Sequence, residues 1–216
     1  MVVVMDKTVL ERADGVCGEL VLRQAGDHHE IIANGMFLMD TRSGESERLL
    51  VRAAADRMRA GGTLLVGGLG VGFSLWEALR LPDVGKVVVV EREEAVIRWN
   101  NGPLGTADAL ADPRTQCVHA DLVSWLTAST DAFDALCLDI DNGPEWTLDA
   151  TNASLYSPTG LQMLAARLTR GGVLAVWSAN ASQGFLDRLR SQFRAVEALE
   201  VPVARGEPDL VYVATV

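Results

Sequence analysis

The chain has 216 residues and is 49% apolar, so it can bury a substantial core and most simply forms one main domain. Its formal net charge of −10 repels phosphate backbones, which makes nucleic acid a poor candidate substrate and favours small or cationic ligands. The three cysteines are widely separated and form no disulfide framework, and no apolar run approaches a signal-peptide core or a membrane span. We therefore expect a cytoplasmic protein without membrane partners.

The N-terminal part of the sequence alternates apolar and polar residues. Between residues 18 and 39 the alternation runs on both sides of an Ala-Gly-Asp turn, which is typical of a β-hairpin or short meander. Residues 45–60 place leucines and alanines at helical spacing, begin with Ser and Glu and stop at two glycines. This second segment therefore predicts a helix.

From residue 63 onward the chain repeats an apolar, β-branched run, a turn and an amphipathic helix. Five such alternations predict a parallel sheet covered by helices on both faces, with its functional edge at the carboxyl ends of the strands. Residues 194–216 break the pattern, because two alternating strands follow each other with no helix between them. We predict an α/β, Rossmann-like fold with a mostly parallel seven-stranded sheet and a C-terminal antiparallel hairpin. This domain would occupy residues 45–216, after a small N-terminal β-region over residues 1–44.

A glycine-rich turn follows the first parallel strand and precedes a helix. Its glycines are Gly67, Gly68, Gly70 and Gly72. Glycine lets the backbone turn sharply and lets a ligand lie against bare peptide. A dinucleotide fingerprint needs G-x-G-x-x-G, whereas the shorter G-x-G-x-G spacing here resembles motif I of S-adenosylmethionine-dependent methyltransferases. The turn is therefore a candidate cofactor-binding loop.

Two acids follow the next strands at the same predicted edge. Glu91 ends the second strand, nineteen residues beyond Gly72, where a carboxylate can accept hydrogen bonds from two ribose hydroxyls. Alternatively, Glu91 is a solvent-exposed acid at the start of the following helix, where its negative charge suits the helix dipole. Asp121 ends the third strand, near the adenine expected there, and its alternative role is the N-cap of the following helix. We favour the cofactor-binding role for both.

The fourth parallel strand runs directly into three acids. Asp139, Asp141 and Glu145 follow the apolar run, and they suit catalysis, metal binding or the mere end of the strand. A strand end does not need three acids, and a metal would need further ligands. We take Asp139 and Asp141 as candidate catalytic residues, with Glu145 setting the charge preference for the acceptor.

Two aromatic residues follow these acids as candidate substrate-binding residues. Trp146 would wall the pocket and attract a cationic acceptor through its face, or else it simply packs on a loop. Tyr156 either faces the acceptor or is a hydrogen-bonded structural tyrosine. We predict no metal site, because His28 and His29 point to opposite faces of a strand and His119 lacks partners at ligand spacing.

Five segments between residues 30 and 178 resemble motifs of the spermidine synthase, or polyamine aminopropyltransferase, family. They are NGMFLMDTRSGESERLL, VGGLGVG, VVEREEAVI, HAD and FDALCLDIDNGPEW, in that order. They are similar to the family segments DG-x-x-Q-x-T-x-x-D-E-x-x-Y-x-E-M, GGGDGG, V-E-I-D-x-x-V-I, GDG and YD-x-I-x-x-D-S-S-D-P-x-G-P. The resemblance implies a Rossmann-like methyltransferase fold preceded by a small β-domain, and a homodimer, since family members commonly form dimers.

The resemblance also implies roles for individual residues. The glycine loop and Glu91 would hold the nucleoside, Asp121 would hold adenine, Asp139 would match the catalytic aspartate, and Asp141 would substitute approximately for the second aspartate. The departures fall on the polyamine side: Leu38 replaces a glutamine, Glu47 replaces a tyrosine, and Gly70 replaces the aspartate that contacts the aminopropyl amine.

The loss of the acid at position 70 decides between two sulfonium donors. Without it, the α-carboxylate of ordinary S-adenosylmethionine is no longer repelled. We therefore predict an S-adenosylmethionine-dependent methyltransferase that acts on a small acceptor such as an amine, with Asp139 as orienting group or general base. The alternatives are an aminopropyltransferase that uses decarboxylated S-adenosylmethionine and a non-catalytic nucleoside-binding protein. A nicotinamide oxidoreductase is weaker because of the glycine spacing.

Overall fold

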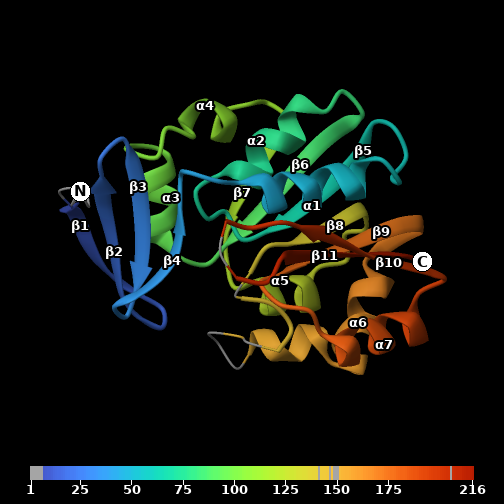
Figure 1. Ribbon diagram of the computed structural model, residues 1–216. Coiled ribbons are helices and arrows are strands. Elements are labelled where there is room, and N and C mark those ends of the chain that lie inside the picture. Colours follow the sequence, from blue (N-terminus) through green and yellow to red (C-terminus); the bar gives the residue numbers. More distant parts are fainter. Residues whose placement is uncertain (1–6, 141, 146, 148–150, 205) are drawn as a thin grey trace.

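The computed structural model describes residues 7–140, 142–145, 147, 151–204 and 206–216. Within these residues the chain forms a four-stranded and a seven-stranded sheet, joined through helix α1 (Glu45–Ala55) (Figure 1). No helix in the described part of the chain is long and apolar enough to cross a membrane.

The N-terminal sheet is an antiparallel meander in which each strand pairs with the next along the chain. The alternation predicted over residues 18–39 corresponds to its last three strands. The prediction missed the first strand because most of its side chains are exposed, so its sequence carries no apolar face. The strands are β1 (Lys7–Gly15), β2 (Gly18–Ala25), β3 (His28–Ala33) and β4 (Met36–Asp40).

The second sheet has the order β10-β11-β9-β8-β5-β6-β7. The strands from β5 to β9 are parallel, and β11 runs antiparallel between β9 and β10. The predicted α/β class, with a mostly parallel seven-stranded sheet and a C-terminal antiparallel hairpin, is thereby confirmed. The strands are β5 (Gly62–Gly67), β6 (Val84–Glu91), β7 (Thr115–His119), β8 (Phe133–Leu138), β9 (Leu168–Ser178), β10 (Ala195–Val201) and β11 (Asp209–Thr215).

Helices cover both faces of this sheet because successive apolar residues of each strand point to opposite sides. Leu64 and Val66 pack into the core under α1 and the next three helices, whereas Leu65 packs into the core on the other face. The first group continues with α2 (Phe73–Arg80), α3 (Glu94–Asn100) and α4 (Ala107–Leu110). The second group is α5 (Leu122–Ala128), the 3₁₀ helix η1 (Asn152–Tyr156), α6 (Pro158–Ala166) and α7 (Gln183–Gln192).

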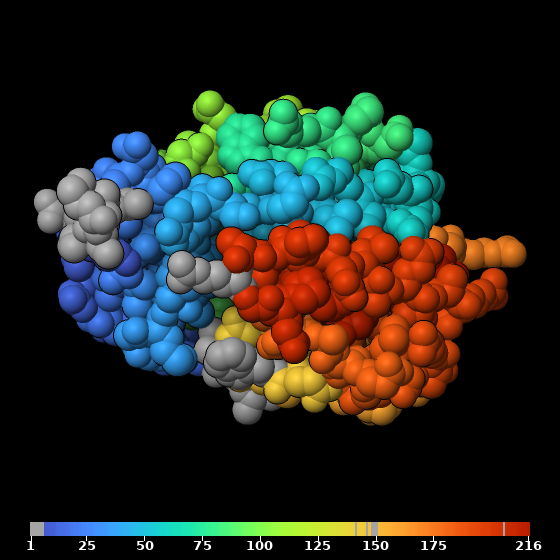
Figure 2. Space-filling model, viewed as in Figure 1, coloured from blue at the N-terminus to red at the C-terminus, as the bar shows by residue number. Residues whose placement is uncertain are grey.

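The register of the parallel strands brings their carboxyl ends to one level. Gly67 pairs with Val90 on one side and with Leu138 on the other. The N-terminal sheet lies beside this edge, where the backbone N–H of Val16 donates to Glu93 Oε2 at 3.0 Å. The C-terminal hairpin packs against α1 on the face shown in Figure 2. The strand ends are thus covered by segments from both ends of the chain.

Candidate active site

The loop between β5 and α2 favours glycine at the four predicted positions, and three of them, Gly68, Gly70 and Gly72, have positive φ. A Cβ on Gly68, whose φ is 90°, would overlap the carbonyl oxygen of Asp139, and a Cβ on Gly70 would lie 2.7 Å from Met39 Sδ. Gly67 and Gly72 pack closely against neighbouring side chains. A Cβ added to Gly67 would lie 2.6 Å from Leu122, and one added to Gly72 would lie 2.7 Å from Thr106. Gly68 and Gly70 line a cavity, whereas Gly67 and Gly72 shape the turn.

Glu91, at the end of β6, holds this loop in place through a hydrogen bond to its backbone. Its carboxylate accepts hydrogen bonds from the backbone N–H groups of Leu69 and Glu93, both at 2.8 Å. The side chain is buried, and this burial raises its pKa despite the two bonds. Glu91 also lines the same cavity, and a carboxylate has lone pairs for further donors. It therefore holds the loop while still offering acceptor sites to a ligand.

Asp121 has one of the two roles that the sequence left open, and its position is compatible with the other. Its Oδ1 accepts from the backbone N–H of Ser124 at 2.8 Å, so it is the N-cap of α5. It also lines the cavity that contains the glycine loop. Its contact with adenine stays a prediction.

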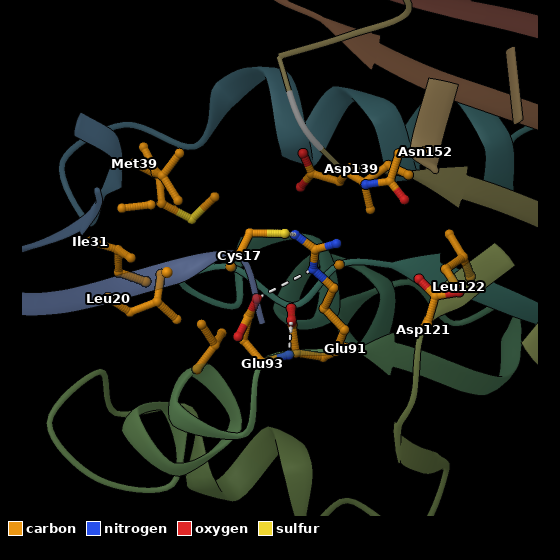
Figure 3. Close-up of a pocket in the computed structure, with 18 of the residues that line it drawn as sticks. Cys17, Leu20, Ile31, Met39, Glu91, Glu93, Asp121, Leu122, Asp139 and Asn152 are labelled. Carbon is orange, nitrogen blue, oxygen red and sulfur yellow. Dashed lines mark hydrogen bonds and ion pairs between the residues drawn. The ribbon is translucent and has the colours of Figure 1, made fainter. Parts of the chain in front are cut away.

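This first cavity has a volume of about 260 Å³ and lies between the two sheets. Figure 3 shows Leu20, Ile31 and Met39 of the N-terminal sheet on one side, facing Asp121 across the cavity, with Glu91 between them. The N-terminal sheet therefore supplies an apolar wall to a site whose polar groups come from the strand ends.

Asp139 stands where two cavities meet. Its backbone N–H donates to the carbonyl of Gly67 at 2.9 Å, which extends the β5–β8 pairing by one residue. Ser74 Oγ donates to its carboxylate at 3.2 Å. Burial, with the nearby charges of Glu47 and Asp209, raises the pKa of Asp139 to about 8. The residue lines the first cavity and also a second one beside it.

The second, acid-lined cavity has a volume of about 410 Å³. Besides Asp139, its wall includes Glu47 from α1 and Asp209 from the start of β11. The hydroxyl of Ser46 lies 3.0 Å from Glu47 Oε2 and 2.8 Å from Asp209 Oδ2, so it bridges the two acids. Burial and the charge of Asp209 raise the pKa of Glu47. Three carboxyl groups from distant parts of the sequence thus share one site.

Four further residues were predicted for the site. Asp141 and Trp146 fall outside the described residues. Glu145 accepts from Ser182 Oγ at 2.6 Å and pairs with Arg188 at 3.2 Å, and it lines neither cavity. Tyr156 is only 2% exposed and packs edge-on against a core phenylalanine. The roles given to all four from the sequence stay predictions.

Neither Asp209 nor Glu47 is predicted from the sequence to have a role in the site. The available signal for Asp209 was its position at the first residue of an antiparallel strand. The beginning of such a strand lies at the same edge as the carboxyl ends of its parallel neighbours. No group of three or more metal-binding side chains in the described ranges is arranged to hold an ion.

The fold and the loop define the class of the protein: a Rossmann-like α/β fold with a glycine-rich first turn and an acid after its second parallel strand. No protein-family model matches the chain. The structure superposes on the crystal structure of spermidine synthase from Thermotoga maritima with a TM-score of 0.77 and 16% identity, covering 96% of this chain and 72% of that one. A spermidine synthase in complex with the transition state analogue AdoDATO gives a TM-score of 0.80 and 16% identity, covering 98% and 75%.

Sequence comparison points to the same family. A polyamine aminopropyltransferase of Mycobacterium tuberculosis is 30% identical over 165 residues, and one of Ralstonia nicotianae is 25% identical over 168 residues. The chain is a divergent member of the spermidine synthase-like family. The matched segment covers 73% of this chain in both cases but only 30% and 31% of those relatives.

Proposed function

We propose that this chain is a transferase of the aminopropyltransferase type, which moves an aminopropyl group from decarboxylated S-adenosylmethionine to an amine. The sequence alone favours methyl transfer, because Gly70 carries no acid. Two observations now favour the alternative: the matched relatives are named polyamine aminopropyltransferases, and acids reach the site from other elements. Glu47 and Asp209 line the acid-lined cavity that adjoins the glycine loop through Asp139.

The observation that carries the proposal is the shared position of Asp139 between the two cavities. Because Ser46 touches both Glu47 and Asp209, their nearest oxygens lie within about 6 Å. Two full charges at that distance repel by about 3 kcal/mol at an effective dielectric constant of 20. An ammonium group relieves this repulsion, whereas the α-carboxylate of unmodified S-adenosylmethionine would add to it.

The first cavity has the groups that an adenosine moiety requires. Gly68 and Gly70 offer bare backbone, Glu91 offers acceptors to ribose hydroxyls, and Asp121 offers an acceptor to the adenine amine. The apolar N-terminal sheet covers the base from the other side. The sulfonium of the donor supplies the electrophilic carbon and the leaving group, so the protein needs no nucleophile of its own.

Asp139 would orient the acceptor and take its proton. With its pKa at about 8, the carboxyl group is largely protonated at neutral pH. A cationic ligand beside it stabilises the carboxylate form and so lowers that pKa. The carboxylate then accepts the proton that the amine must lose, a contribution of about 10²- to 10⁴-fold to the rate.

The test compares three ligands by calorimetry: decarboxylated S-adenosylmethionine, the unmodified compound and methylthioadenosine. We expect the decarboxylated donor to bind more tightly than S-adenosylmethionine, and Asp139→Asn to retain donor affinity while aminopropyl transfer falls at least 100-fold. Preference for S-adenosylmethionine would instead restore the methyltransferase interpretation. Donor binding without transfer to any amine would favour the non-catalytic, nucleoside-binding alternative.

A further inference from the structure

The acid-lined cavity has two chemically different ends. At its inner end lie Glu47, Asp139 and Asp209. Its outer part has apolar side chains from β4 and from the segment after β10, which both lie on the face shown in Figure 2, together with Asp40, Ser43 and Glu45. Phe37 is 53% exposed and Val203 38%, so they lie at the opening. The wall between these ends includes Leu38, Trp177, Pro202 and Ala204.

The acids nearer the opening are already neutralised. Asp40 is ion-paired with Arg42, which holds the pKa of Asp40 below its ordinary value although burial raises it. Glu45 pairs with Arg52 at 3.0 Å. Among the described residues that line the cavity, the acids without a basic partner are therefore those at the inner end.

We propose that the acceptor is an amine with one cationic group on an apolar body, and that a diamine of equal length is the poorer ligand. This inference rests on the proposed function and specifies the substrate class of its acceptor site. The ammonium group of the acceptor lies against Asp139 and shares the inner acids with the ammonium group of the donor, and the apolar body lies along the wall that ends at Phe37 and Val203. A second ammonium group at the far end would meet apolar side chains and acids already paired with arginine.

Two physical effects separate these ligands. Each methylene group that the wall buries increases affinity about fourfold, and this gain is available to both ligands. The second charge of a diamine must either lose its hydration against the apolar wall of the cavity or lie at the opening, where the acids that line the cavity are already paired with arginine. A monoamine meets neither cost, so the difference in affinity between the two ligands comes only from the group at the far end of the carbon chain.

Calorimetry with hexylamine and 1,6-diaminohexane tests this difference directly. The two ligands have the same carbon chain and differ by one amino group. With methylthioadenosine present, at pH 7 and 0.15 M salt, we expect hexylamine to bind at least tenfold more tightly. Equal binding, tighter binding of the diamine, or binding of neither would overturn the inference.

A matched pair of variants locates the effect. Val203→Asp places an acid at the opening, whereas Val203→Asn changes polarity there without adding charge. We expect Val203→Asp to reduce the preference for hexylamine at least tenfold and Val203→Asn to leave it within threefold. If both variants behave alike, the charge of the opening does not select the ligand and the inference fails.

Failure of the proposed function would look different. Aminopropyl transfer would be absent with every amine, while the binding preference for hexylamine and its loss in Val203→Asp would remain. Conversely, efficient transfer to 1,6-diaminohexane with no preference for hexylamine would leave the proposed function standing and remove the inference.

Discussion

At the scale of single residues, Asp139 lines both cavities, and its backbone and side chain both contact the residues around the glycine loop. Its N–H continues the pairing with Gly67, its carbonyl leaves no room for a Cβ on Gly68, and its carboxylate faces Ser74. The glycine loop and the acid therefore have a fixed relative position. The position of Asp139 follows from the register of β5 and β8.

The raised pKa of Asp139 predicts a specific pH dependence of stability. Its pKa rises from 3.8 to about 8 on folding, so between these values the folded state binds a proton that the unfolded state has lost. The free energy of unfolding therefore falls as pH rises through this window, by up to about 1.4 kcal/mol per pH unit. Asp139→Asn removes this loss, so we expect its stability relative to the wild type to increase from pH 5 to pH 8 and then level off.

Urea unfolding at each pH unit from 5 to 9 measures this difference. The exposed Asp131→Asn variant is the control, and its stability relative to the wild type should change little with pH. Parallel curves for Asp139→Asn and the wild type would show that Asp139 does not keep a proton on folding.

The site residues that could be predicted from the sequence are those that directly follow a predicted strand. Glycine spacing predicts the β5–α2 loop, and Glu91 and Asp139 follow apolar runs that end at one sheet edge. Glu47 and Asp209 could be brought together only by the tertiary structure, because α1 and β11 are far apart in the sequence and meet in the folded protein. Glu145 shows the converse, since its proximity to Asp139 in sequence does not bring it to the cavities.

At the scale of elements, α3 supports the glycine loop. Asn100, its last residue, is fully buried, and its Nδ2 donates both to the carbonyl of Gly70 at 2.8 Å and to that of Val96 at 2.9 Å. The helix is thus tied to the loop by a single amide group. This role could not be predicted from the sequence, because an asparagine at a helix end most often serves as a cap.

A pair of neighbouring variants tests this support. Asn100→Asp replaces the donor with an acceptor that faces the carbonyl of Gly70, so we expect at least a tenfold loss of methylthioadenosine affinity. The cost in stability should be about 1–3 kcal/mol. The exposed Asn101 also donates to a carbonyl four residues earlier, at 3.0 Å, but does not contact the loop. Asn101→Asp should therefore leave affinity unchanged, and equal losses in calorimetry would exclude a specific role for Asn100.

At the scale of the whole molecule, the first cavity depends on the placement of the N-terminal sheet. Arg98 of α3 forms an ion pair with Glu11 of β1, and Glu93 accepts from the backbone of Val16. The predicted boundary between residues 44 and 45 falls between β4 and α1. The independence of these two regions and the predicted homodimer both stay predictions.

Limited proteolysis tests whether a nucleoside holds the two regions together. Arg42 lies in the connection between them and Arg170 lies in β9, and both are exposed to trypsin. Because both sheets line the first cavity, we expect saturating methylthioadenosine to slow cleavage after Arg42 at least threefold more than cleavage after Arg170. Equal slowing at both sites would mean that the ligand stabilises the chain as a whole without joining the two regions.

The walls of the two cavities differ in where they originate along the chain. The glycine loop, Glu91, Asp121 and Asp139 come from the middle of the chain and are fixed by the parallel strands. The opening of the acid-lined cavity comes from β4 and from residues 201–204, towards the two ends of the chain. Leu38 and Met39 of β4 line both cavities, whereas residues 201–204 line only the acid-lined one. Under the proposed function, substitutions in residues 201–204 would therefore change the choice of acceptor without altering the donor site.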